Sequence, residues 1–81
     1  MTPLPNGSLI AFLKSGSPKE TWLLMTENDD EMMVRAGEIG MILDFKKNKP
    51  ECYKVLINDH VLIDVDEFMF ESLRQMPEST L

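Results

Sequence analysis

Short apolar runs, separated by turn-forming residues, recur along the chain and constrain its fold more than any other feature. The runs cover residues 9–13, 21–25, 32–34, 39–45, 52–57 and 61–65. Each has the length of a strand rather than that of an ordinary helix, and turn clusters such as Ser15-Gly16-Ser17-Pro18 separate them. This spacing predicts an all-β domain.

The chain has 81 residues, which is enough for one domain. We expect this domain at residues 8–75, between tails at 1–7 and 76–81 that contain prolines and polar residues. Cys52 is the only cysteine, so packing rather than an internal disulfide must stabilise the fold. No apolar stretch approaches the ~20 residues of a membrane span, and the first residues lack a signal-peptide pattern. We therefore expect a cytoplasmic protein.

The last two runs predict a β-hairpin, whose register depends on the length of its loop. A three-residue loop at 58–60 gives three facing pairs, which are Ile57 with Val61, Val55 with Ile63, and Tyr53 with Val65. A two-residue loop would instead set Val61 opposite the face that carries Leu56. Because a one-residue slip moves a whole set of side chains across the sheet, we predict the longer loop.

Residues 66–73 fit two local structures. Asp66 could cap a helical turn, because Met69 and Leu73 follow at helical spacing. A single 3₁₀ turn that leads into a short closing strand also fits, and we favour it.

Three segments together resemble a known class of fold. They are Gly37–Leu43 with its two glycines, Tyr53–Ile57, and Asp64-Val65 followed by a turn that ends at Leu73. This pattern is similar to SH3-like, KOW-type barrels, and above all to the small uncharacterised SH3-like proteins of tailed bacteriophages. The resemblance implies a small SH3-like barrel of five to six short, bent strands, encoded by a phage and acting in the host cytoplasm. In such a barrel Gly37 permits a turn and Gly40 a close approach of strands.

The charge of the chain weighs against nucleic acid and membranes as partners. Eight basic and fourteen acidic residues give a formal net charge of −6, which repels polyanions at long range. The basic cluster consists of Lys46, Lys47 and Lys49, and it defines the alternative function, a KOW-like nucleic-acid-binding module. No aromatic residue interleaves with these lysines, and lysine-rich loops also discourage pairing between sheet edges.

A catalytic pair of cysteine and histidine requires contact between thiolate and imidazole. Cys52 and His60 are the only candidates, and the five strand positions between Cys52 and the turn span roughly 17 Å at ~3.3 Å per residue. No other nucleophile, phosphate-binding or dinucleotide motif is present. We expect no catalytic residue, no cofactor and no small-molecule substrate, and the chain not to be an enzyme.

Two acidic clusters contain carboxylates that could bind a metal ion, but neither has the full pattern of a known type of metal site. In the run Glu27–Glu31, Met32 stands where a calcium loop requires glycine. One histidine cannot build a typical zinc site with the neighbouring aspartates at 59, 64 and 66. We read both clusters as solvated surface.

Apolar residues on both faces of the strands predict a protein partner or self-association. Ile39, Met41, Leu43 and Phe45 alternate along one run and are expected to face the core. The opposite faces then present Ile42 and Leu56, and Met32-Met33 offers an adaptable surface. The predicted partner contacts are Met32, Met33, Ile42 and Leu56. Trp22 and Tyr53 are too few to supply a peptide groove lined by aromatic rings, and we assign them to core packing.

Overall fold

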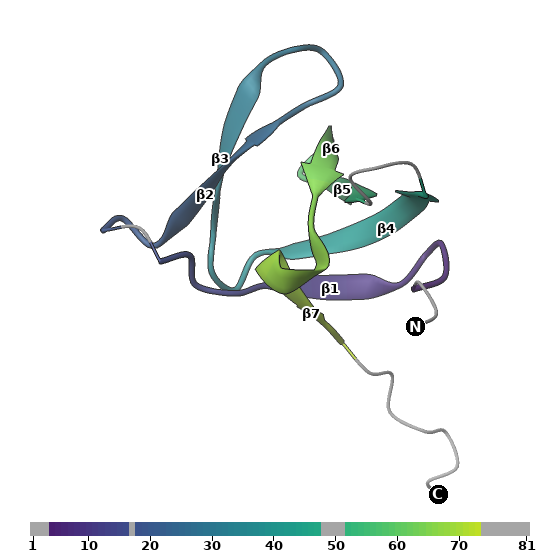
Figure 1. The fold of residues 1–81 in the computed structure, drawn as a ribbon, viewed down its shortest axis with the longest axis horizontal. Coiled ribbons are helices and arrows are strands. Elements are labelled where there is room, and N and C mark those ends of the chain that lie inside the picture. The colour runs from purple at the N-terminus through teal and green to yellow at the C-terminus, as the bar shows by residue number, and fades with distance from the viewer. Residues whose placement is uncertain (1–3, 17, 48–51, 74–81) are drawn as a thin grey trace, which may run out of the picture.

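The computed structural model describes residues 4–16, 18–47 and 52–73. In these residues the chain forms seven strands and one 3₁₀ turn, η1 (Figure 1). The elements are β1 (Leu9–Phe12), β2 (Thr21–Met25), β3 (Glu31–Arg35), β4 (Ile39–Lys46), β5 (Cys52–Ile57), β6 (His60–Val65), η1 (Glu67–Met69) and β7 (Phe70–Ser72). The all-β prediction is confirmed, and every apolar run contains a strand. The predicted tail at 76–81 lies outside the described residues.

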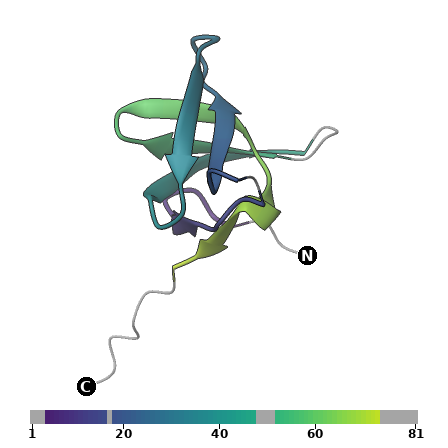
Figure 2. The same ribbon diagram turned by 90° about the vertical axis from the view of Figure 1, so that its left-hand side faces the viewer.

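The strands form two sheets rather than the closed barrel that the resemblance implied. Five strands pair in the order β6-β5-β4-β1-β7, β2 pairs with β3, and all these pairs are antiparallel. Figure 2 shows the β2–β3 hairpin crossing the β5–β6 hairpin at a steep angle. The two sheets are joined by an isolated bridge between Thr26 and Leu62, not by a continuous ladder. The predictions of a closed barrel and of five to six strands are therefore wrong.

The β5–β6 hairpin has a two-residue turn, so the predicted three-residue loop is wrong. Ile57 pairs with His60, and the turn residues Asn58 and Asp59 have φ values of 48° and 65°. Two successive residues with positive φ are the signature of a type I′ turn, whose twist matches that of the flanking strands. Asn and Asp tolerate this conformation better than most residues.

A β-bulge explains how the shorter turn remains compatible with the core. Val55 pairs with Leu62, and the register then shifts so that Tyr53 pairs with Val65 as predicted. The extra residue in β6 turns both Leu62 and Val65 inward, where each is fully buried. The predicted pair of Val55 with Ile63 does not form, and Ile63 is only half-buried.

A second bulge reverses the predicted faces of β4. The register between β4 and β5 shifts between Ile42 and Asp44, so strict alternation does not hold along the strand. Ile42 is fully buried in the core, whereas Ile39 is 49% exposed. Phe45 packs against the core as predicted, but Met41 and Leu43 do not belong to the buried set.

Gly37 and Gly40 have the two roles that the sequence predicted for them. Gly37 has φ +92° and lies in a turn in which the Glu38 N–H donates to the Arg35 carbonyl at 3.2 Å. This geometry is that of a type II turn, which favours glycine at its third position. Gly40 lies where β4 passes close to β5 and β1.

The core lies between the two sheets. Its buried members are Ile10, Phe12, Leu24, Val34, Ile42, Tyr53, Val55, Ile57, Leu62, Val65, Met69 and Phe70. Phe70 contacts the rings of both Phe12 and Tyr53 edge-on, at centroid distances of 6.3 and 5.4 Å. The Tyr53 hydroxyl accepts a hydrogen bond from the Leu4 N–H at 3.2 Å, which satisfies the one polar atom of this buried side chain.

Residues 66–73 adopt the favoured arrangement, a 3₁₀ turn followed by a short strand. Asp66 makes no side-chain capping hydrogen bond, so it does not act as a helix cap. The Leu13 N–H donates to the Met69 carbonyl at 2.9 Å, and Phe12 pairs with Phe70. Pairing with β1 therefore ends η1 and begins β7. No helix among the described residues is long and apolar enough to cross a membrane.

Candidate interaction surface

An apolar row crosses the five-stranded sheet on the face opposite the core, with one residue from each of four strands and Leu73, which directly follows β7. Leu9 pairs with Met41, Met41 with Leu56, and Leu56 with Val61. The register of β1 and β7 places Leu73 beside Leu9, whose carbonyl accepts a hydrogen bond from the Leu73 N–H at 2.9 Å. Side chains directly opposite each other on one face of a sheet lie within contact distance. We call these five residues the outer row.

The outer row is open to solvent over much of its length. Leu9 is 47% exposed and Leu73 is 37% exposed, while Met41, Leu56 and Val61 are half-buried. A second apolar pair lies beside the row, formed by Ala11 and Ile39, of which Ile39 is 49% exposed. Single exposed apolar residues are ordinary, but a continuous set across a sheet marks an interaction surface. The outer row together with Ala11 and Ile39 is called the outer face below.

Charged residues lie at the two ends of the outer face. Glu71 pairs with Ala11, and Glu38 and the turn residue Asp59 lie at the same end of the strands. The opposite end carries Lys54 and Lys46, whose strand partners are Asp44 and Cys52. We call the first the acidic end and the second the lysine end.

Each end also contains residues of the other sign. At the acidic end, the Glu38 carboxylate accepts hydrogen bonds from the backbone N–H of Arg35 at 2.8 Å and from Asn58 Nδ2 at 3.3 Å. At the lysine end, Lys47 follows Lys46, Asp44 pairs with Lys54, and Asp64 and Asp66 lie close enough to act with Lys46 on the Cys52 thiol. The lysine end therefore carries as many aspartates as lysines.

The predicted partner contacts do not lie on one surface. Leu56 belongs to the outer row, but Ile42 is buried in the core and cannot contact a partner, because the bulge in β4 turns it inward. Met32 packs against the core. Met33 is 57% exposed and pairs with the exposed Leu23 on the β2–β3 hairpin, away from the outer face.

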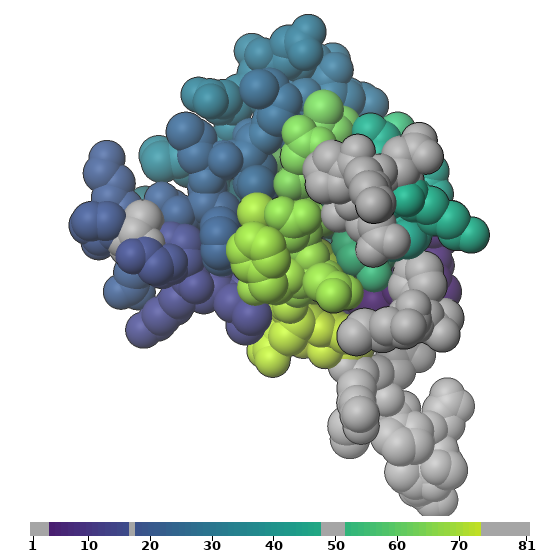
Figure 3. Space-filling model, in the orientation of Figure 1, coloured from purple at the N-terminus to yellow at the C-terminus, as the bar shows by residue number. Residues whose placement is uncertain are grey.

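The predicted core role of Trp22 is only partly fulfilled. Its ring packs against the core, its Nε1–H donates to the Leu13 carbonyl at 2.8 Å, and its free side meets Phe68 at a centroid distance of 6.0 Å. Phe68 is 65% exposed on η1. The yellow-green η1 segment lies at the surface beside the blue β2 segment in Figure 3. No pattern in the sequence indicates this pair, because its members are 46 positions apart and meet only through the fold.

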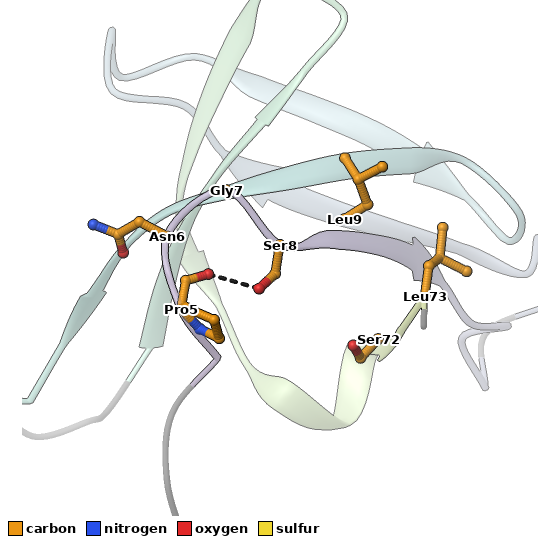
Figure 4. A pocket seen from close by; sticks show the side chains of 7 residues that line it. All are labelled: Pro5, Asn6, Gly7, Ser8, Leu9, Ser72 and Leu73. Carbon is orange, nitrogen blue, oxygen red and sulfur yellow. Dashed lines mark hydrogen bonds between the residues drawn. The ribbon is translucent and has the colours of Figure 1, made fainter. Parts of the chain in front are cut away.

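An open groove borders the outer row at Leu9 and Leu73 (Figure 4). It has a volume of about 500 Å³, and its lining residues are Pro5, Asn6, Gly7, Ser8, Leu9, Ser72 and Leu73. The Ser8 hydroxyl is already used, since it donates to the Pro5 carbonyl at 2.7 Å. None of the lining residues carries an acid, a base or a thiol, and the groove extends the interaction surface at Leu9 and Leu73.

The residues considered for catalysis and metal binding lie apart from one another. Cys52 begins β5, and its thiol donates to the Ile63 carbonyl at 3.4 Å, whereas the exposed His60 lies at the far end of the hairpin. Burial, followed by the nearby Asp64, raises the pKa of the Cys52 thiol. The acidic run at 27–31 covers the tip of the β2–β3 hairpin and the first residue of β3, and Thr26 Oγ1 accepts hydrogen bonds from two backbone N–H groups at this tip. Within the described ranges, acidic, histidine and cysteine side chains form no group of three that could hold a metal ion.

The lysines of the predicted nucleic-acid site are only partly described. Lys46 and Lys47 are exposed at the end of β4, and Lys49 lies outside the described residues. Lys54 lies at the same end of the outer face, one strand away from Lys46. Arg35 lies at the acidic end, so it does not extend this lysine cluster.

No protein-family model matches the chain, and no curated protein or solved structure matches it. Fold and surface together define a small all-β protein with an exposed apolar sheet face. Its function is therefore inferred from the geometry of its own residues.

Proposed function

We propose that the chain is a non-enzymatic protein-interaction module that binds its partner through the outer face. The observation that carries this proposal is the outer row, which crosses one sheet with an apolar residue from each of four strands and with Leu73 after the fifth. Catalysis would need reactive groups brought together, and the Cys52 thiol and the His60 imidazole are held at opposite ends of β5.

The outer face has the anatomy of a protein interface. Its centre is apolar, and its charged residues lie at the two ends, as in interfaces with a dry core and a polar rim. Complete burial of a leucine or isoleucine side chain is worth about 1.5–3 kcal/mol, and Leu9, Ile39 and Leu73 each retain more than a third of their exposure. Covering these three side chains alone supplies a substantial part of a binding free energy.

We also propose that the module is SH3-like, with its two sheets left open, and that it derives from a phage. The strand order supports the first part, because β1 lies between β4 and the final strand β7, and a 3₁₀ turn precedes β7. The β2–β3 hairpin folds over the remaining strands as a long excursion between β1 and β4 (Figure 1). The phage origin rests on the sequence resemblance alone.

Capture of partners from the cells that produce the protein tests the interaction surface. The variant Leu9→Lys places a charge in the outer row, and Leu23→Lys places the same charge at a more exposed position on the β2–β3 hairpin. We expect wild type and Leu23→Lys to retain the same proteins, and Leu9→Lys to lose them while its thermal unfolding stays close to that of wild type. Equal capture by all three proteins would contradict the proposed surface.

A further inference from the structure

We propose that the free edge of β3 binds an extended, basic segment of a partner protein, which adds to the β2–β3 hairpin as a third strand. This inference goes beyond the proposed function, because it assigns a second site, on the other sheet. Among the described strands β3 pairs only with β2, so one long side of β3 is open.

The register of the hairpin shows which backbone groups lie along this edge. In an antiparallel pair of strands, residue pairs that exchange hydrogen bonds alternate with pairs that do not. The Thr26 N–H donates to the Asp30 carbonyl at 2.7 Å, so the next pairs that exchange hydrogen bonds are residue 24 with 32 and residue 22 with 34. The N–H and carbonyl groups of Glu31, Met33 and Arg35 therefore point away from β2.

Two of these three residues have backbone groups that are free to bind a further strand. Arg35 is already paired, since its N–H donates to the Glu38 carboxylate at 2.8 Å and its carbonyl accepts from the Glu38 N–H at 3.2 Å. Within the described part of the chain, the outward N–H and carbonyl groups of Glu31 and Met33 have no such partner. Donors and acceptors on alternate residues of an edge are the groups with which a sheet binds an extended segment.

The edges of the five-stranded sheet are less suited to such a segment. Along β6 the Val61 carbonyl accepts from the Glu27 N–H at 2.9 Å, and Leu62 forms a bridge with Thr26, so the β2–β3 hairpin already covers part of that edge. At the other edge β7 has only three residues. The five-residue β3 belongs to a hairpin whose tip projects beyond the rest of the molecule (Figure 2).

The charge of the hairpin indicates the chemistry of the partner. Arg35, at the end of β3 away from the tip, is the only basic residue in 21–35. Among the described residues, the four carboxylates at the tip and at the start of β3 form no ion pair, and all four residues are exposed. These residues are Glu27, Asp29, Asp30 and Glu31. A basic segment is attracted to this edge, whereas a second copy would bring the same negative surplus against it.

The side chains along the edge specify the order of residues in the added segment. Met33 is 57% exposed, and a side chain directly opposite it would lie in contact with it. A segment antiparallel to β3 places one residue opposite Met33 and the residue two positions later opposite Glu31. We expect an apolar side chain at the first of these positions, lysine or arginine at the second, and a further basic residue beside the tip.

A synthetic peptide of sequence Thr-Ile-Thr-Lys-Thr-Lys, with both ends blocked, tests the inference when it is added to the full chain at low salt. Its isoleucine is designed to lie opposite Met33 and its first lysine opposite Glu31. We expect a dissociation constant of about 10–100 μM by NMR titration. Hydrogen exchange at the two edge amides should slow roughly 10-fold at a free peptide concentration about ten times the dissociation constant, because exchange then requires dissociation.

Backbone methylation of the peptide separates strand addition from attraction between charges. N-methyl groups on the isoleucine and the first lysine remove the donors that face β3, whereas N-methyl groups on the threonines that follow them point away from β3. The two peptides carry the same charge. The first should bind at least about 10-fold more weakly than the second, because it loses two hydrogen bonds to the edge. A peptide with glutamate in place of both lysines should not bind.

Three protein variants test the same edge from the other side. Met33→Pro removes an N–H that points to solvent, a position at which a sheet tolerates proline, and should abolish peptide binding. Glu31→Lys should weaken binding roughly 10-fold. Leu9→Lys alters the outer row and should bind the peptide as wild type does. Thermal unfolding reports on the folding of each variant, and the methylated peptides test the edge on the wild-type chain.

Four outcomes would overturn the inference. They are no binding of the lysine peptide, equal binding of the two methylated peptides, equal binding of the glutamate and lysine peptides, and slow exchange at Glu31 and Met33 in the free protein. The last would show that the edge is already paired. The proposed function fails separately, because capture of partners that depends on Leu9 can persist in Met33→Pro, and peptide binding can persist in Leu9→Lys.

Discussion

A side chain at Gly40 would collide with Val55. A Cβ at position 40 would lie 2.6 Å from Val55 Cγ1 and 3.3 Å from the Leu56 carbonyl oxygen. Val55 is fully buried and its β-branched side chain has little rotamer freedom, so it cannot move aside. We expect Gly40→Ala to lower the free energy of unfolding by about 1–3 kcal/mol, measured by urea denaturation.

Two further variants isolate this contact. Gly16→Ala is the matched control, because an added Cβ there meets no atom within 4 Å and the backbone φ is not positive. We expect it to change stability by less than about 0.5 kcal/mol. In a Val55→Ala background, Gly40→Ala should cost less than in wild type, because the atom with which it collides has been removed. An equal cost in both backgrounds would show that the contact with Val55 is not the cause.

The turn between β5 and β6 offers a stabilising substitution. Asp59 has φ 65° and is the second residue of the type I′ turn, a position that strongly favours glycine. We expect Asp59→Gly to raise the free energy of unfolding by about 0.5–1 kcal/mol, because glycine adopts this conformation without a steric penalty. Asp59→Ala is the control and should destabilise, since alanine keeps the penalty and loses the tolerance of aspartate. Thermal and urea unfolding of the three proteins measure both effects, and a neutral glycine variant would contradict the turn assignment.

The positions of the strands could be predicted from the sequence, but the faces of two strands could not. Alternation of apolar residues is a period-2 signal, and each β-bulge shifts it by one residue. In β6 the bulge brings Leu62 and Val65 to the same side of the sheet. In β4 Ile42 lies in the core, although strict alternation predicts that it faces outward. Because residues 39–43 of β4 and 61–63 of β6 are all apolar or glycine, no polar residue within these stretches reveals the shift.

The candidate interaction surface could be predicted from the sequence only in part. Leu56 was placed correctly on the outside, since β5 keeps its alternation up to the turn. The outer row required the cross-strand register, which depends on the two-residue turn after Ile57 and on the β1–β4 pairing. Asn58-Asp59 is a weaker signal for a type I′ turn than Asn-Gly, so burial arguments favoured the wrong loop.

Thr26 connects the acidic hairpin tip to the five-stranded sheet. Its Oγ1 accepts hydrogen bonds from the N–H groups of Asn28 and Asp30, both at 3.3 Å, and the residue is only 4% exposed. We expect Thr26→Val, which keeps the shape and removes the acceptor, to lower stability by about 1–2 kcal/mol.

The same variant should open the contact between the sheets locally. The Glu27 N–H donates to the Val61 carbonyl at 2.9 Å, so its hydrogen exchange reports on this contact. Exchange at Glu27 should accelerate more than exchange in the β4–β5 ladder. Thr26→Ser retains the hydroxyl and should preserve most of the protection, and equal exchange in both variants would contradict the role of Oγ1.

The thiol of Cys52 should make stability decrease in alkaline solution. Burial, and then the charge of Asp64, raise its pKa above the ordinary value of 9.0, while Lys46 lowers it by a smaller effect. Above about pH 9 the unfolded chain loses this proton before the folded chain does, so ionisation favours unfolding; below that pH both states keep the proton and the effect vanishes. Urea unfolding at pH 8 and pH 10 should therefore show a steeper loss of stability for wild type than for Cys52→Val, in which all other groups titrate as before. Identical slopes would show that the native environment of the thiol does not disfavour its ionisation.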